Sequence, residues 1–160
     1  MPKTPSPQRI QLMRELMDAK RKTTLIHSQY MAKNREYSPG EHLFMREVHF
    51  VMAVGLGEGR TMSELARTLN VTQGAVSQLV ARMEKKGFVV RHKCADDKRQ
   101  TVATLTEKGR LLYQEHTRYD LARYTEILEM LSGYSDEELR RIRDFETILQ
   151  AIFTKADNVH

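Results

Sequence analysis

Two short helical segments in the middle of the chain constrain its fold more than any other feature. Thr61 and Glu64 have the spacing of a capping box and predict a helix over 61–69. After Asn70 and Val71, Thr72 can cap a second helix that Gly87 ends. Two helices joined by so short a turn are typical of a helix-turn-helix. Apolar residues recur at helical spacing in both segments, namely Met62, Leu65, Ala66 and Leu69, then Val76, Leu79, Val80 and Met83.

The pattern changes after this pair of helices. Phe88–Val90 and Thr101–Leu105 are rich in strand-forming residues, and the segment between them, 93–100, is too polar to be buried. This pattern predicts a β-hairpin whose loop projects as a wing. The expected fold class is mainly α with a small β-hairpin wing, that is, a winged helix-turn-helix with additional helices at both ends.

The additional helices carry apolar stripes. A helix is expected over about 8–33, a long one from Thr106, and a last one that Ser135 and Glu138 cap. Because the helix-turn-helix is complete without them, their stripes predict a second copy of the chain as partner, unless they pack only on their own core. The stripes comprise Leu12, Leu16, Ala19, Ile26 and Tyr30, and Leu139, Ile142, Phe145, Leu149 and Ile152.

One further helix should precede the helix-turn-helix. Ser38, Pro39 and Glu41 have the order of an N-cap, a first helical proline and a capping glutamate, so this helix is expected to begin there. The glycines of segment 55–59 end it, and the absence of a preceding strand argues against a phosphate loop. The expected organisation is a winged domain over 38–105, dimerisation helices over 8–37 and 106–154, and flexible tails over 1–7 and 155–160.

Composition narrows the partners and the compartment. The net charge of +5 and the pI of about 9.4 favour a polyanionic partner. The single cysteine, Cys94, excludes an intramolecular disulfide framework and fits a reducing cytoplasm. No apolar run approaches the roughly 18 residues of a membrane span. A cytoplasmic protein with no membrane partner is therefore expected.

The outer face of the helix after Thr72 is small and polar, as a helix in the major groove requires. Gln73, Ser77 and Gln78 are candidates for base edges, and Gly74 would let the backbone approach closely. Arg82 and Lys85 are better placed for phosphates. The alternative is an ordinary solvated helix face. The predicted DNA-binding set is Thr72, Gln73, Gly74, Ser77, Gln78, Arg82, Lys85, Lys98 and Arg99.

Positive charge is concentrated next to this helix. Segment 82–99 holds seven basic and three acidic side chains, which gives a net charge of +4 out of the chain's +5. This is the region where a winged helix meets phosphates or the minor groove. The concentration of charge, rather than its total, therefore favours DNA.

A series of short motifs follows one another along the chain, namely Ser63-Glu64-Leu65-Ala66, Val71-Thr72, Ser77, Leu79, Glu84-Lys85-Lys86-Gly87, Asp97-Lys98-Arg99 and Leu105-Thr106-Glu107-Lys108-Gly109. In this order they resemble the MarR family of bacterial repressors over nearly the whole chain. The resemblance implies that Arg99 enters the minor groove, that Asp97 braces the wing by pairing with an arginine, and that the protein is a homodimer built from its first and last helices. Such a dimer would address a pseudo-palindromic operator.

The resemblance also implies an effector that changes operator affinity. Glu41, His42, His116 and Asp120 are similar in placement to the ligands of the zinc-responsive branch, so a zinc site is one alternative. A hydrophobic or phenolic ligand could occupy the same cleft instead, or the histidines could simply be solvated with no ligand. No cofactor besides zinc is expected.

Two rival functions follow from the same residues. An enzyme is disfavoured because no nucleophile motif, phosphate loop or paired-carboxylate motif occurs in the sequence. A winged helix that contacts RNA or protein is the second rival, since this fold permits it. A comparison of duplex DNA and RNA binding over a series of salt concentrations distinguishes a DNA-binding protein from this second rival.

Overall fold

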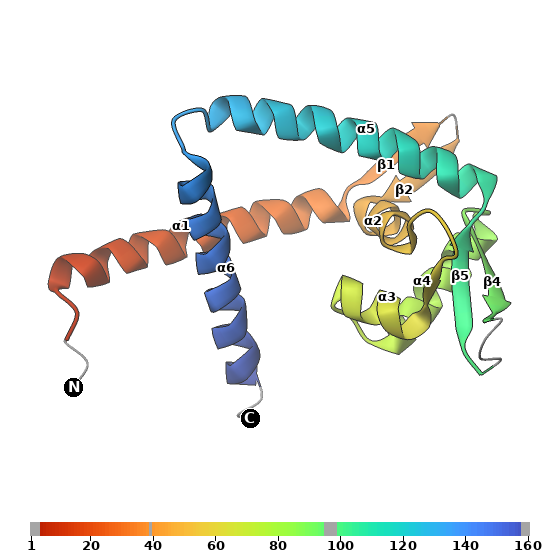
Figure 1. The fold of residues 1–160 in the computed structure, drawn as a ribbon, viewed down its shortest axis with the longest axis horizontal. Coiled ribbons are helices and arrows are strands. Elements are labelled where there is room, and N and C mark those ends of the chain that lie inside the picture. Colours follow the sequence, from red (N-terminus) through yellow and green to blue (C-terminus); the bar gives the residue numbers. More distant parts are fainter. Residues whose placement is uncertain (1–3, 39, 95–98, 158–160) are drawn as a thin grey trace. The chain divides into compact units, whose positions relative to one another are not determined.

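The computed structural model describes residues 4–38, 40–94 and 99–157 of the 160-residue chain. The chain divides into two compact units, Met1–His116 and Thr117–His160. The elements are α1 (Pro7–Ala32), β1 (Asn34–Ser38), β2 (Glu41–Phe44), α2 (Met45–Val54), β3 (Arg60–Thr61), α3 (Met62–Leu69), α4 (Gln73–Lys85), β4 (Val89–Lys93), β5 (Thr101–Leu105), α5 (Glu107–Met130) and α6 (Asp136–Asp157), as Figure 1 shows. This architecture confirms the expected winged helix-turn-helix.

Both sheets are small and antiparallel. β4 and β5 form the wing hairpin, in register from Val89 opposite Leu105 to Lys93 opposite Thr101. β3 extends that sheet, so the strand order is β3-β5-β4. β1 and β2 form a separate hairpin. The sequence did not indicate β3, because a strand of two residues is too short to show a period.

The core of the first unit is built where the helical spacing predicted. Val76, Val80 and Met83 on the inner side of α4 are fully buried, as is Leu65 of α3. Leu79 is only partly buried and packs at the margin of this cluster. Phe50, Val51 and Val54 of α2, and Phe88, Val89, Ala103 and Leu105 of the wing hairpin, complete the cluster.

The predicted caps fix both helices of the helix-turn-helix. The Thr61 N–H donates to Glu64 Oε2 at 2.8 Å, and the Glu64 N–H donates to Thr61 Oγ1 at 3.2 Å. Thr72 Oγ1 accepts from the Ala75 N–H at 3.2 Å. Asn70 ends α3 with a φ of 52° in the left-handed region, which asparagine tolerates better than most residues. The predicted capping box at Thr61 and the predicted cap at Thr72 are confirmed.

The expected start of the preceding helix is wrong. Glu41–Phe44 is a strand paired with β1, and α2 begins only at Met45. Pro39 lies outside the described residues. The Phe44 N–H donates to Glu47 at 2.9 Å, so the capping carboxylate comes from Glu47 rather than Glu41. Pairing with β1 supplies backbone hydrogen bonds to these residues and buries Leu43, which overrides the local capping signal.

Gly109 lets the start of α5 approach the wing hairpin closely. Thr106 caps α5 by accepting from the Gly109 N–H at 3.1 Å, and its hydroxyl donates to the Gly87 carbonyl at 2.6 Å. A Cβ at Gly109 would lie 2.1 Å from the Phe88 carbonyl oxygen. This glycine therefore serves packing, although its helix propensity alone suggested only a small weakening of the helix.

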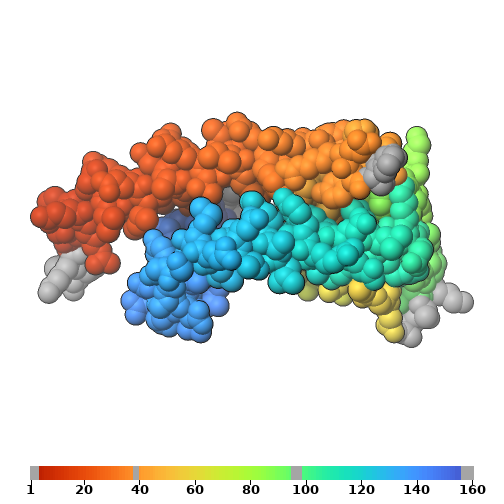
Figure 2. Space-filling view, turned by 90° about the horizontal axis from the view of Figure 1, so that it is seen from above, coloured from red at the N-terminus to blue at the C-terminus, as the bar shows by residue number. Residues whose placement is uncertain are grey.

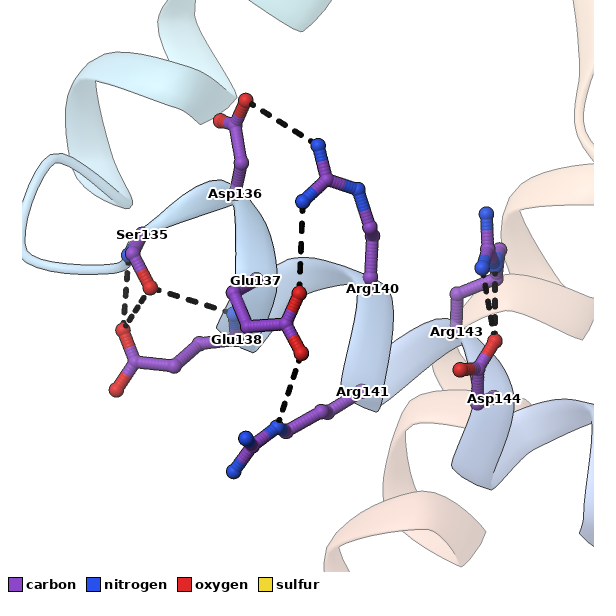
Figure 3. Close-up of polar contacts among 8 residues, drawn as sticks. All are labelled: Ser135, Asp136, Glu137, Glu138, Arg140, Arg141, Arg143 and Asp144. Carbon is purple, nitrogen blue, oxygen red and sulfur yellow. Dashed lines mark hydrogen bonds and ion pairs between the residues drawn. The ribbon is translucent and has the colours of Figure 1, made fainter.

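The second unit contains the last predicted capping box (Figure 3). The Ser135 N–H donates to Glu138 Oε2 at 2.8 Å, and the Glu138 N–H donates to Ser135 Oγ at 3.3 Å. The Ser135 N–H and hydroxyl hold the pKa of Glu138 below its usual range. Arg140 pairs with Asp136 and Glu137 on the exposed face of α6, where such pairs contribute little to stability.

Helix reaches into both segments that the sequence assigned to flexible tails. α1 begins at Pro7, where Ser6 Oγ accepts from the Arg9 N–H at 3.3 Å, and α6 continues to Asp157. None of the residues of α1 is buried, and Figure 2 shows its N-terminal part as a red rod with exposed side chains. Within the described residues, no helix has the length and apolar composition needed to cross a lipid bilayer.

Candidate nucleic-acid interface

The outer face of α4 is exposed, as the sequence predicted. Gln73, Ser77 and Gln78 are all accessible, while Val76 and Val80 on the opposite side are fully buried. Gly74 lies on the same exposed face. A Cβ there would meet no atom nearer than Thr72 Oγ1 at 3.9 Å, so the space in front of it is open. The helix therefore presents a small, polar surface that another molecule can reach.

Hydrogen bonds orient two of these side chains. Gln73 Nε2 donates to Ser63 Oγ of α3 at 2.9 Å. The Ser77 hydroxyl donates to the Gln73 carbonyl at 2.9 Å, which leaves its oxygen as an acceptor. The link between Gln73 and Ser63 was not predicted, because the two residues are ten apart and meet only through the packing of α3 on α4. It turns the Gln73 amide toward α3.

The basic residues at the end of α4 divide into outward and inward ones. Lys85 is exposed, and the Arg82 side chain is 47% exposed with its Nη1 4.0 Å from Glu47 Oε1. Lys86 turns inward, where its Nζ donates to Glu47 Oε2 at 2.9 Å and to the His42 carbonyl at 3.0 Å. Lys86 thus links the end of α4 to the start of α2 through an ion pair. Arg82 and Lys85 are directed outward, where a phosphate can contact them.

A buried Glu47 is the feature that the sequence reasoning missed. Its carboxylate is 1% exposed and accepts from both the Phe44 N–H and Lys86. Its place in the chain, three residues after Phe44, resembles that of an ordinary capping glutamate, so only the packing of α4 shows that the site is closed to water.

The wing carries less free charge than its composition suggests. Arg91 pairs with Glu84 at 2.5 Å, and this arginine holds the pKa of the Glu84 carboxyl below its usual range. Arg99 is exposed at the base of the wing loop. Lys98 and Asp97 lie outside the described residues, so the bracing role of Asp97 stays a prediction.

A polar groove of about 700 Å³ lies between α3, the start of α4 and the wing. Ser63 and Arg67 of α3 line one wall, Gln73 belongs to α4, and Arg99 and Gln100 come from the wing. In Figure 1 the yellow-green α3 and α4 lie beside β5. The groove joins the predicted recognition helix to the predicted wing contact, and its Arg67 and Gln100 are residues that the sequence analysis did not single out.

A second, more apolar pocket of about 520 Å³ lies where α1, α2, α3 and α4 meet. Its polar side chains are Arg46, His49, Thr68, Gln78 and Arg82. Its apolar side chains are Met31, Leu69, Val71, Ala75 and Leu79. Gln78 lines the same pocket, so an occupant would touch a predicted base-reading residue.

The predicted metal ligands do not converge. Glu41 accepts a hydrogen bond from Lys108, and His42 is exposed on β2. His116 is 3% exposed, with its ring 5.8 Å from that of His49. Asp120 lies one turn further along α5 and is half-buried. Among the described residues, no three His, Cys, Asp or Glu side chains are grouped so that they could hold a metal ion. The donor set therefore does not fit zinc as the sequence proposed it.

The fold, the exposed face of α4 and the basic wing define a winged helix-turn-helix protein. Residues 45–100 match the model of the MarR family. The transcriptional regulator YhjH of Bacillus subtilis is 28% identical over 116 residues, which cover 70% of this chain and 66% of that protein. The chain spans less than two thirds of the length of the curated relatives it matches.

Two solved structures show the same fold. FabT of Streptococcus pneumoniae, crystallised in complex with DNA, is 24% identical with a TM-score of 0.65 over 92% of this chain and 99% of that one. The zinc-responsive ZitR of Lactococcus lactis is 19% identical with a TM-score of 0.65 over 88% of this chain and 99% of that one. At these identities the likeness shows the fold alone.

Proposed function

We propose that this chain is a DNA-binding transcriptional regulator that acts as a repressor. The observation that carries the proposal is the exposed polar face of α4, with Ser77 and Gln78 opposite the buried Val76 and Val80. In this arrangement α4 enters the major groove and Arg99 approaches the minor groove. The relatives, described as HTH-type transcriptional regulators, favour this function over catalysis.

The regulator acts as a homodimer on a pseudo-palindromic operator. Large apolar side chains are exposed along α1 and, separately, along α6. Leu16 is 42% exposed and Ile152 is 54% exposed, and a second copy would remove such side chains from water. They comprise Ile10, Leu12, Leu16, Leu25 and Ile26 on α1, and Ile142, Ile148, Ile152 and Phe153 on α6.

The decisive experiment compares duplex DNA with RNA. The unaltered chain is expected to sediment as a dimer and to select a duplex with inverted half-sites from a random pool. Its affinity for that duplex should fall steeply with salt, because several phosphates are neutralised. A monomer without duplex binding, or tighter binding to RNA at every salt concentration, would contradict the proposal.

Replacement of Gln78 by alanine tests whether α4 reads bases. The variant is expected to lose about 1 to 3 kcal/mol of preference for the selected duplex over random DNA, since a bidentate contact to a base edge disappears. Parallel titrations of both duplexes by fluorescence anisotropy measure this preference. An equal loss on both duplexes would show that Gln78 does not read sequence.

We also propose that an aromatic carboxylate in the 520 Å³ pocket is the effector. Arg46 and His49 supply positive and hydrogen-bonding groups, while Met31 and Leu69 supply apolar walls that suit a ring. An occupant there contacts Gln78 and Arg82 and so withdraws them from DNA. This site is favoured over the zinc alternative because the pocket exists among the described residues, whereas the metal ligands do not converge.

The effector proposal is tested with benzoate and zinc as probes. Benzoate is expected to weaken duplex binding by the unaltered chain, and Arg46→Ala should abolish that response because it removes the charge that holds the carboxylate. Duplex affinity without benzoate should be unchanged in this variant. If zinc alters duplex affinity and the double variant His42→Ala, His116→Ala loses that response, the zinc alternative is correct instead.

A further inference from the structure

The polar groove beside α4 suits a ligand different from that of the apolar pocket. Two guanidinium groups, of Arg67 and Arg99, line it together with the hydroxyl of Ser63 and the amide of Gln100. All four side chains can donate hydrogen bonds, and two of them are cationic. Its volume of about 700 Å³ is far larger than one phosphate group, so the groove suits an extended anion.

We infer that this groove is a binding site for the sugar-phosphate backbone of DNA next to the recognition helix, hereafter the backbone-binding site. Arg67 and Ser63 of α3 are then phosphate-contacting residues. The inference rests on the proposed DNA-binding function and adds to it a contact outside both α4 and the wing. Because the groove lies between Gln73 and Arg99, a strand seated there passes from the mouth of the major groove toward the wing.

Gln73 acts in this backbone-binding site as a positioning residue, because it orients the hydroxyl of Ser63. Its Nε2 donates to Ser63 Oγ at 2.9 Å, so the serine oxygen is occupied as an acceptor and the hydroxyl hydrogen can point to an anion. The same hydrogen bond holds the Gln73 amide against α3 rather than along the outer face of α4. Gln73 thus contributes to the affinity for any duplex, whereas Gln78 contributes to the choice of sequence.

One carboxylate in the backbone-binding site disfavours phosphate binding. Glu64 lines the groove, and the Thr61 N–H and hydroxyl, with Arg60 and Arg67 nearby, hold its pKa below the usual range. Glu64 is therefore ionised at neutral pH and repels phosphate. Since glutamine also closes a capping box, Glu64→Gln removes this repulsion while it keeps the start of α3.

The test measures how the affinity of the full-length chain for a mixed-sequence duplex depends on salt. Arg67→Ala is expected to reduce the slope of log K against log salt by about 0.9 for each lost phosphate contact, and so by about two in a dimer. Arg141→Ala is the matched control, because it removes the same charge from the exposed face of α6, outside the groove. Glu64→Gln is expected to tighten duplex binding severalfold, and Gln73→Ala to weaken binding to selected and mixed duplexes by the same factor.

The outcomes separate this inference from the function on which it rests. If the unaltered chain binds duplex DNA but Arg67→Ala and Arg141→Ala change the slope equally, the backbone-binding site is contradicted while the DNA-binding function stands. The same holds if Glu64→Gln leaves duplex affinity unchanged in a variant whose thermal unfolding matches the unaltered chain. If the unaltered chain binds no duplex, both the proposed function and the backbone-binding site are contradicted.

Discussion

The Lys86→Met variant is expected to lose about 3 kcal/mol of its free energy of unfolding, because an uncompensated charge then stays inside the protein. The substitution keeps most of the side-chain volume but removes the ammonium group that lies 2.9 Å from the buried carboxylate of Glu47. Because Lys86 is itself 28% exposed, we expect the lower end of the usual range. Chemical denaturation at neutral pH measures the loss.

Lys85→Met is the matched control for this prediction. Lys85 is the neighbouring lysine on α4 and its side chain is exposed, so its replacement should change stability by only a few tenths of a kcal/mol. Adding Glu47→Gln to Lys86→Met should recover part of the loss, because no buried charge is then left behind. Equal destabilisation by the two lysine variants would contradict a role for Lys86 in balancing Glu47.

The Gly109→Ala variant is expected to be destabilised by about 3 kcal/mol, near the upper end of the range for overpacking. A Cβ at this position would lie 2.1 Å from the Phe88 carbonyl oxygen and 3.2 Å from Leu105 Cβ, so α5 and the wing hairpin must move apart. The obstructing atom belongs to the backbone of the junction into β4 and cannot rotate away. Thermal and chemical unfolding monitored by circular dichroism give the size of the effect.

Gly74→Ala provides the control, because it makes the same chemical change in the first turn of another helix. The nearest atom to its new Cβ is 3.9 Å away, so alanine should stabilise the protein by roughly 0.4 to 1 kcal/mol, because it reduces the conformational entropy of the unfolded chain. The two glycine variants are therefore expected to shift stability in opposite directions. If Gly109→Ala were as stable as Gly74→Ala, the close approach of α5 to Phe88 would not exist in solution.

The sequence was most informative where local chemistry decides the structure. The capping boxes at Thr61 and Ser135 and the cap at Thr72 depend on side chains within three residues of the backbone groups they satisfy. The buried side of α4 followed from spacing alone. Hence the helix-turn-helix, the wing hairpin and the exposed polar face of α4 could all be predicted.

Prediction failed where a neighbouring strand and a distant side chain compete for the same residues. Ser38 to Glu41 has a convincing local signal for a helix start, yet Glu41–Phe44 pairs with β1 and Glu41 accepts from Lys108 far along the chain. The same long-range contact removes Glu41 from the expected metal site. Local capping is worth about 1 kcal/mol, which a strand ladder and the burial of Leu43 exceed.

The sequence by itself determined that the chain forms a winged helix-turn-helix with Ser77 and Gln78 directed outward, because periodicity and capping act over a few residues. Only the tertiary structure decided that Lys86 neutralises Glu47 and that Gln73 turns toward Ser63. Only the tertiary structure showed that the absence of a side chain at Gly109 allows the Phe88 carbonyl to approach α5 closely. These relations join residues that are distant in the chain, and their energies depend on burial and on approach to within a few ångströms, which no local pattern encodes.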